Sequence, residues 1–328
     1  MKKTIVKFSA FILLFIALVF SAVGCRDIMA SAKAKSPLTY LVIGIDDAAK
    51  NADIIMLVGC VPGENRLSFL QIPRDTYYNY GKGQNKINGV FSHCLNSGLS
   101  NKEALRAFSE NIEDSFGVDI SASFAITIDA FKQFVSSLGG VTVDMPYDYT
   151  FTNEKGEGAF TLSEGENLLS ADMSETFIRY RRGYALGDLS RINAQKIFLR
   201  GMIKTVTNKR FTELAGALFS VRDKLYADCE ITDILKMLVK KPGSNKDIAC
   251  KFATLPGEAV MSENGISYFS VNRKNAREVL SLYFGASEFD KDKLLLNPES
   301  RAFYNVYYDE NAEYFEYSDK DFDSIKLR

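Results

Sequence analysis

The chain has 328 residues, of which 46% are hydrophobic and 25% are charged, and its formal net charge is −1 at pH 7. This near-neutral balance argues against a nucleic-acid partner, because proteins that bind nucleic acids generally carry a basic surface. The single histidine, His93, argues against a Ser/His/Asp triad and against a histidine-based zinc site.

The N-terminus carries a membrane-targeting segment. Residues 10–25 are uncharged and largely apolar, and three lysines precede them. A helix of that length would span about 24 Å, slightly less than a bilayer core of about 30 Å. Two interpretations stay open: residues 1–25 form a lipoprotein-type signal peptide ending at Cys25, or they form an uncleaved signal anchor. Both place the rest of the chain outside the cytoplasm and tethered to the membrane, with polar residues 26–37 as the tether.

Strand and helix patterns then alternate along residues 38–285 and predict a layered α/β domain with a mixed sheet. Strands are expected at residues 38–45, 53–61, 66–72, 121–128, 141–145, 251–255 and 267–271. Helices are expected at residues 88–96, 101–116, 129–138, 166–180, 188–207, 212–225, 232–239 and 274–284, with an irregular or hairpin segment at 146–165. Ser100 and Glu103 have the spacing of a capping box for the second helix. Residues 286–328 form an acidic, tyrosine-rich tail.

The first candidate site residues are Asp46, which follows the strand at 38–45, and Asp53, which begins the next strand. Carboxylates at neighbouring strand ends can meet at one edge of a sheet. Mg²⁺ is typically held by one or two carboxylates together with phosphate oxygens and water. The alternative is that both are turn aspartates around Asn51, a common role for Asp.

Arg74 and Asp75 follow the strand at 66–72, directly after Pro73. If the strands are arranged suitably, Arg74 lies on the same side of the sheet as the two aspartates. The alternative is a surface turn with a local ion pair, which contributes less than about 1 kcal/mol.

Residues 177–195 contain four arginines and no lysine. Arg179, Arg181 and Arg182 precede a glycine-containing loop, and Arg191 lies in the helix that begins after it at Asp188. Arginine matches phosphate oxygens two at a time, and helix N-termini favour anions. The segment therefore predicts a phosphate or diphosphate site.

One face of the helix at 188–207 changes from polar to apolar along its length. Asp188, Arg191 and Gln195 share a helical face, which continues as Phe198, Leu199 and Met202. This pattern would suit an amphiphile with a phosphate head and a hydrocarbon tail. Alternatively, the helix faces the core and Asp188 only caps its first turn.

Several of these segments occur together in one order that resembles the LytR-CpsA-Psr family of bacterial cell-envelope proteins. The match covers about residues 38–205 and rests on Gly44-x-Asp46, Asp53, Ile72-Pro73-Arg74-Asp75-Thr76-Tyr77, Lys86-Ile87-Asn88, Leu138-Gly139-Gly140-Val141-x-Val143, Arg179-Tyr180-Arg181 and Gly187-Asp188-x-x-Arg191-x-x-x-Gln195. Arg182 lies outside the matched pattern.

The resemblance implies a three-layer α/β/α domain on the extracytoplasmic face of the bacterial membrane. It implies a phosphotransferase that uses Mg²⁺ to move a glycopolymer from a polyprenyl-diphosphate carrier onto peptidoglycan. The implied residue roles are metal binding by Asp46 and Asp53, diphosphate binding by Arg74, Arg179, Arg181, Arg191 and Gln195, and orientation of arginines or acceptance of a proton by Asp75 and Asp188.

The chain departs from the family pattern at three positions. The family often has Arg where this chain has Asn51, Gly where it has Ser190, and Arg where it has Ala194. Two possible phosphate contacts are therefore missing. Two alternatives follow: an envelope protein that binds polyprenyl phosphate or glycan without chemistry, and a polyprenyl-diphosphate hydrolase. The polymer itself is not indicated by the sequence.

Overall fold

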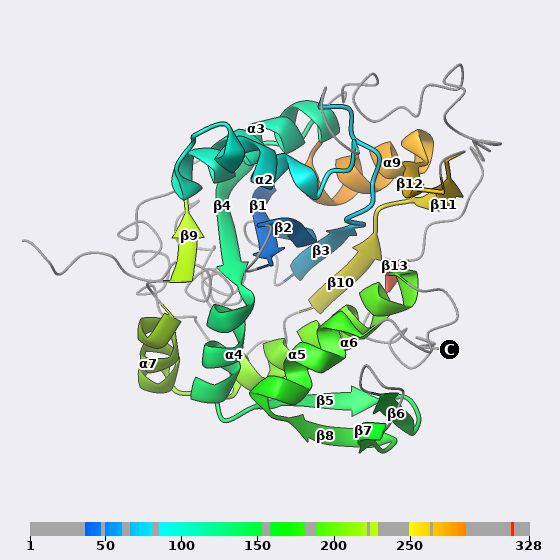
Figure 1. Cartoon of the computed structure of the whole chain (residues 1–328). Coiled ribbons are helices and arrows are strands. Elements are labelled where there is room, and N and C mark those ends of the chain that lie inside the picture. Colours follow the sequence, from blue (N-terminus) through cyan, green and yellow to red (C-terminus); the bar gives the residue numbers. More distant parts are fainter. Residues whose placement is uncertain are drawn as a thin grey trace, which may run out of the picture.

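The computed structural model describes residues 37–46, 50–60, 66–80, 85–152, 158–180, 188–221, 224–228, 249–262, 265–286 and 316–317. Its strands are β1 (Leu38–Ile45), β2 (Ala52–Cys60), β3 (Arg66–Ile72), β4 (Ile120–Thr127), β5 (Val141–Met145), β6 (Tyr149–Thr152), β7 (Gly158–Leu162), β8 (Gly165–Leu169), β9 (Leu225–Ala227), β10 (Ala249–Thr254), β11 (Gly257–Met261), β12 (Ser267–Val271) and β13 (Glu316–Tyr317). Its helices are α2 (Gly89–Asn96), α3 (Asn101–Phe116), α4 (Ile128–Ser137), α5 (Ala171–Arg179), α6 (Asp188–Thr207), α7 (Phe211–Val221) and α9 (Arg273–Phe284). Figure 1 shows this order along the chain.

The centre of the described structure is a mixed sheet with the strand order β13-β10-β3-β2-β1-β4-β9. The strands β1, β3, β4 and β10 run in one direction, and β2 runs against β1 and β3. The carboxyl ends of those four strands therefore share one edge of the sheet with the beginning of β2. The opposite edge holds the beginning of β1, at Leu38. The predicted α/β fold with a central mixed sheet is confirmed.

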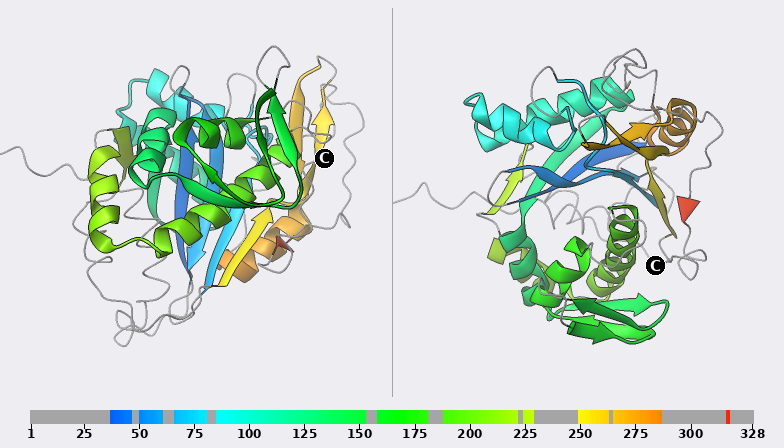
Figure 2. Two further views of the ribbon diagram at one scale, coloured as in Figure 1. Left: turned by 90° about the horizontal axis from the view of Figure 1, so that it is seen from below. Right: turned by 45° about the vertical axis from the view of Figure 1, so that its right-hand side comes forward.

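Helices cover both faces of this sheet (Figure 2). One core cluster joins side chains of α4, α5, α6 and α7 to one face, together with the β5–β8 pair. A second cluster joins α2, α3 and α9 to the other face. Strand β1 supplies side chains to both clusters, which explains why its sequence is almost continuously apolar.

Helix boundaries follow the local signals in the sequence. Ser100 caps α3 by accepting a hydrogen bond from the Glu103 amide, and the Glu103 side chain accepts one in return from the Ser100 amide. Gly117 ends the same helix with a left-handed φ of 63°. The predicted capping box is therefore confirmed, and the hairpin expected within residues 146–165 is formed by β6 and β7.

Two predicted helices are too long. Residues 166–169 belong to β8, which pairs with β5, and α5 starts only after Ser170, whose side chain caps it. Similarly, the helix expected at 212–225 ends at Val221, and Leu225 begins β9. In both places strand pairing with a distant segment outweighs the local helical pattern. Strand β11 was not predicted, and the helix expected at 232–239 lies outside the described residues.

None of the helices in the described part of the chain is both long and apolar enough to cross a membrane. The apolar segment at residues 10–25 lies outside that part.

Candidate functional site

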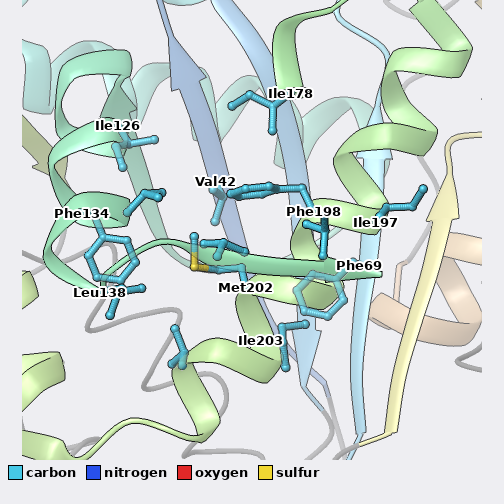
Figure 3. Packing of buried hydrophobic residues seen from close by; sticks show 14 of the residues in the cluster. Val42, Phe69, Ile126, Phe134, Leu138, Ile178, Ile197, Phe198, Met202 and Ile203 are labelled. Carbon is cyan, nitrogen blue, oxygen red and sulfur yellow. The ribbon is translucent and has the colours of Figure 1, made fainter. Parts of the chain in front are cut away.

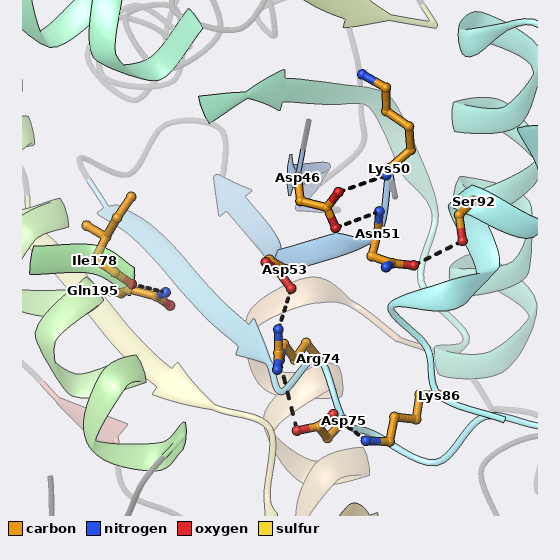
Figure 4. A network of polar contacts seen from close by, with 10 residues as sticks. All are labelled: Asp46, Lys50, Asn51, Asp53, Arg74, Asp75, Lys86, Ser92, Ile178 and Gln195. Atoms are coloured by element: carbon orange, nitrogen blue, oxygen red, sulfur yellow. Dashed lines mark hydrogen bonds and ion pairs between the residues drawn. The ribbon is translucent and has the colours of Figure 1, made fainter. Parts of the chain in front are cut away.

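The sheet edge brings Asp46, Asp53 and Arg74 into one region (Figure 4). Asp46 follows the end of β1, Asp53 lies at the beginning of β2, and Arg74 follows the end of β3. Arg74 Nη1 donates a hydrogen bond to Asp53 Oδ1 at 2.5 Å. Because β2 is antiparallel to both neighbours, its first residues lie beside their last ones. Arg74 is therefore on the side of the sheet that we expected.

The ion pairs continue from Arg74 into the turn after β3. Asp75 Oδ2 lies 4.0 Å from Arg74 Nε, and Asp75 Oδ1 accepts a hydrogen bond from Lys86 Nζ at 2.8 Å. The turn is fixed by Thr76, whose hydroxyl donates to the Pro73 carbonyl at 2.6 Å. Asp75 is thus held between two cations, and Arg74 between two carboxylates, so the guanidinium is oriented before any ligand binds.

Asp46 has a structural role as well as a place at this edge. Its carboxylate accepts hydrogen bonds from the backbone amides of Lys50 at 2.9 Å and Asn51 at 3.2 Å. Asn51 Oδ1 accepts one from the Ser92 hydroxyl at 3.0 Å. Asp46 therefore does stabilise the turn around Asn51, as the alternative interpretation proposed. Each carboxylate oxygen has a second lone pair, so these bonds leave room for a cation.

No group of three or more His, Cys, Asp or Glu side chains gathers at a common point within the described ranges. The candidate metal site there consists of Asp46 and Asp53 alone, with one oxygen of Asp53 already bonded to Arg74. Two carboxylates completed by phosphate oxygens and water match the usual coordination of Mg²⁺, so the residues fit this ion.

Gln195 and Arg191 are buried in the first turns of α6, with 6% and 4% of their surfaces exposed. Gln195 Nε2 donates to the Ile178 carbonyl at 2.9 Å and so ties α6 to α5. Its Oε1 is buried and has no hydrogen-bond partner among the described residues. A buried acceptor without a partner costs about 1–3 kcal/mol, which a ligand or water that donates to it would recover.

Of the other predicted residues of this segment, only the side chain of Arg179 is described. Arg179 is 54% exposed and pairs with Glu175 of its own helix at 2.7 Å. Arg181, in the loop before α6, lies outside the described residues. Asp188 begins α6, and its side chain is likewise not described. Of the arginines expected at the diphosphate, the structure places Arg74 at the sheet edge and Arg191 in α6, and their contact with a phosphate stays a prediction.

An apolar cavity of about 130 Å³ lies between the sheet and helices α4, α5 and α6. Its wall is almost entirely hydrocarbon and consists of Val42, Gly44, Ile54, Met56, Val58, Phe69, Ile126, Thr127, Ile128, Phe131, Phe134, Ile178, Gln195, Phe198, Leu199 and Met202. Figure 3 shows Val42, Ile126, Phe198 and Met202 on this side of the sheet. A Cβ at Gly44 would lie 3.2 Å from Ile54 Cβ, so glycine allows the close approach of Ile54 in this part of the wall.

The residues that form this cavity were only partly predicted. Phe198, Leu199 and Met202 belong to the apolar stripe of α6 and do line it. The residues of β1 and β2 were not predicted to line a cavity, because an apolar strand has the same sequence pattern whether it faces a core or a cavity. Gln195 and Thr127 are the polar residues of the wall, and Gln195 is also bonded to the Ile178 carbonyl of α5.

Lys196 is a further buried cation that sequence reasoning missed. It is 4% exposed, and its Nζ donates to the Thr254 hydroxyl at 2.8 Å. Burial lowers the pKa of its ammonium group from 10.5 to about 7. Its position in the sequence, between Gln195 and Ile197, gives no sign of burial, since a lysine in a helix is usually exposed.

Together, fold and site define an α/β protein with an apolar cavity between the sheet and helices α4, α5 and α6, and with paired carboxylates and Arg74 at the carboxyl edge of the sheet. Comparison with known protein families agrees with the sequence resemblance: residues 21–283 match the LytR_cpsA_psr family. The chain therefore belongs to the LytR-CpsA-Psr family.

Individual relatives are distant. The polyisoprenyl-teichoic acid–peptidoglycan teichoic acid transferase TagU of Oceanobacillus iheyensis is 23% identical over 254 residues, which cover 76% of each chain. TagU of Bacillus anthracis is 26% identical over 247 residues, covering 72% of this chain and 74% of the relative. The crystal structure of B. subtilis TagV superposes with a TM-score of 0.60 at 20% identity, covering 78% of this chain and all of TagV. At this identity, the structural likeness establishes the fold alone.

Proposed function

We propose that the protein is an extracytoplasmic phosphotransferase that moves a glycopolymer from a polyprenyl-diphosphate carrier onto peptidoglycan. The observation that carries the proposal is the apolar cavity lined in part by Gln195, with Arg191 buried one turn away on α6. Such a site suits an amphiphile whose chain is hydrocarbon and whose head is anionic. Family membership and the names of the relatives, which are teichoic acid transferases, support the same class of reaction.

In this reaction the acceptor hydroxyl attacks the phosphorus that carries the sugar, and the bond to the polyprenyl phosphate breaks. Arg74 and Arg191 would hold the nonbridging oxygens and stabilise the charge that develops on the leaving group. Asp53 and Asp75 flank Arg74 at 2.5 Å and 4.0 Å and keep its guanidinium in place. Because Asp75 is already shared by Arg74 and Lys86, its arrangement favours orientation of Arg74 over acceptance of the proton. Asp188 is then the candidate that accepts the proton of the acceptor hydroxyl.

Asp46 and Asp53 are the residues that would hold Mg²⁺. When bound there, this ion would supply a Lewis acid for the diphosphate oxygens. Arg179 and Arg181 are proposed to complete the diphosphate contacts once the carrier is bound. The N-terminal segment would keep the protein at the outer face of the membrane, where both the lipid carrier and peptidoglycan are found.

The transfer itself is tested by supplying the purified full chain with a polyprenyl-diphosphate-linked glycan and peptidoglycan. We expect a glycan–peptidoglycan conjugate and free polyprenyl phosphate in equal amounts, and neither product without peptidoglycan. Release of glycan phosphate without an acceptor would instead identify a hydrolase. Retention of the lipid without any product would identify a binding protein. Asn51 and the fully buried Ala194 motivate this alternative, because the family often has arginine at both positions.

Asp53→Asn should raise the Mg²⁺ concentration that gives half-maximal transfer by at least about tenfold, since even indirect partners of a bound metal contribute about 10–100-fold to its affinity. The measurement is a Mg²⁺ titration of the initial rate after treatment with a chelator. Asp129→Asn is a matched control, because Asp129 forms only an exposed contact with Lys224 at 3.5 Å. An unchanged Mg²⁺ requirement in folded Asp53→Asn would contradict the assignment of the metal ligands.

A further inference from the structure

A buried lysine beside the site has no role in the mechanism above. Resting on the proposed function, we propose that Lys196 binds the phosphate of the lipid donor and is the second cation of α6 in the donor site, beside Arg191. The ligand class is a phosphate or diphosphate ester attached to a hydrocarbon chain. No position in the matched sequence pattern assigns this role to residue 196.

The position of Lys196 supports this role. It follows Gln195, which lines the cavity, and it precedes Leu199, another cavity residue, by one helical turn. Its Nζ reaches Thr254, the last residue of β10, on the side of the sheet that faces α6. Lys196 is thus a neighbour in the chain of residues that line the cavity, and its Nζ lies at the edge of the sheet where the strands end.

Strand register places this contact close to Arg74. Thr254 is paired with Gln71 of β3, and the Leu255 amide donates to the Gln71 carbonyl at 2.8 Å. Arg74 follows Gln71 by three residues, just beyond the end of β3. The side chain of Gln71 is also buried, so polar groups from β3, β10 and α6 adjoin one another along this edge. An anion held by Arg74 and Arg191 would lie within the same region.

The burial of Lys196 is compatible with a bound phosphate. Burying an ammonium group is unfavourable unless its charge is paired, and a phosphate would pair it. Burial brings the pKa of Lys196 to about 7, whereas an adjacent phosphate would favour its charged form. Ala194 lacks a polar group and is fully buried, so Lys196 is the cation that this turn of α6 provides.

The test compares variants of the full chain in detergent for binding of farnesol, farnesyl phosphate and farnesyl diphosphate by calorimetry. Lys196→Gln keeps a group that can bond to Thr254 but removes the charge. We expect it to reduce the preference for the phosphorylated ligands over farnesol by about tenfold or more, because a hydrogen bond to a charged group contributes about 1.5–3 kcal/mol. Binding of farnesol should stay unchanged, and Lys196→Arg should recover part of the preference.

Lys204→Met is the matched control on the same helix. Lys204 is exposed and pairs with Glu166 at 2.6 Å, outside the site, so its replacement should leave the preference as in the wild type. A loss of farnesol binding and a lowered Tm would show that Lys196→Gln does not fold. In that case the preference for phosphorylated ligands is compared between Lys196→Met and Lys196→Arg. Equal preferences for phosphorylated ligands in these two variants would overturn the inference.

The same experiment separates this inference from the proposed function. A wild-type preference for phosphorylated ligands that survives in folded Lys196→Gln overturns the role of Lys196 and leaves the donor site intact. A wild-type protein that binds farnesol and farnesyl diphosphate equally well has no phosphate site, and that result overturns the proposed function together with the inference.

Discussion

Arg74→Ala is expected to lower the rate of glycopolymer transfer by about 10²–10³-fold, the usual cost of removing one electrostatic donor from such a site. Arg74 is positioned by Asp53 at 2.5 Å and by Asp75, and both carboxylates would lose this partner. Asp53 and Asp75 are partly exposed, so water can solvate them and the protein should stay folded. The measurement is the initial rate of conjugate formation, with circular dichroism to establish the fold.

Arg106→Ala is the control for this prediction. Arg106 is a surface residue of α3 that pairs with Glu110 one turn away at 3.0 Å, so its loss should not alter the rate. Arg74→Lys should remain strongly impaired, because lysine supplies charge without the planar pair of donors. Transfer at the wild-type rate by folded Arg74→Ala would remove Arg74 from the site, and with it the part of the proposal that rests on the sheet edge.

Met56→Trp is expected to abolish binding of the lipid carrier, and therefore transfer, by filling the apolar cavity. Met56 lines this cavity and is only partly buried, although it lies in the middle of the sheet. An indole ring at this position would occupy much of the roughly 130 Å³ that the wall encloses. Overpacking of this kind costs about 1–3 kcal/mol of stability, which a folded domain of this size can tolerate.

The wild-type chain has no tryptophan, so the new indole is also a unique fluorescent probe. Met261→Trp is the matched control, since Met261 is 54% exposed on β11 and does not line the cavity. We expect blue-shifted emission from Trp at position 56, solvent-like emission at position 261, and normal transfer only in the second variant. Normal lipid binding in Met56→Trp would show that the hydrocarbon chain lies elsewhere.

Much of the fold was predictable because local signals and tertiary structure agree. The strands at 38–45 and 66–72 and the helix at 101–116 have the predicted bounds. The helix predicted at 166–180 begins too early, because nothing in the sequence of residues 166–169 indicates that they pair with β5. Strand β9 was not predicted for a related reason: its three residues form a strand because they pair with β4, and their own sequence has no strand pattern.

The site was predictable in its residue types but not in its pairings. The sequence indicates that Asp53 and Arg74 are candidates, but their contact depends on β2 being antiparallel to β3, which an apolar strand pattern does not reveal. Arg179 pairs with Glu175, one helical turn away, and the prediction of a phosphate contact did not include this local partner. Lys196 could not be recognised because its partner, Thr254, is 58 residues distant in the chain.

The direction of β1 has a consequence for how the protein would meet its substrates. The described chain enters this strand near the end of α9, where Pro37 lies next to Gly285. The eight residues of β1 then span about 26 Å before Asp46 is reached. Entry point and proposed site therefore lie at opposite ends of the domain. If residues 1–25 hold the chain at the membrane, the tether at 26–37 reaches at most about 40 Å when extended. The domain must then rotate about residues 26–37 so that its proposed site faces the bilayer and binds the lipid head. Otherwise the site faces the peptidoglycan, and the head group of the carrier must extend from the bilayer to reach it.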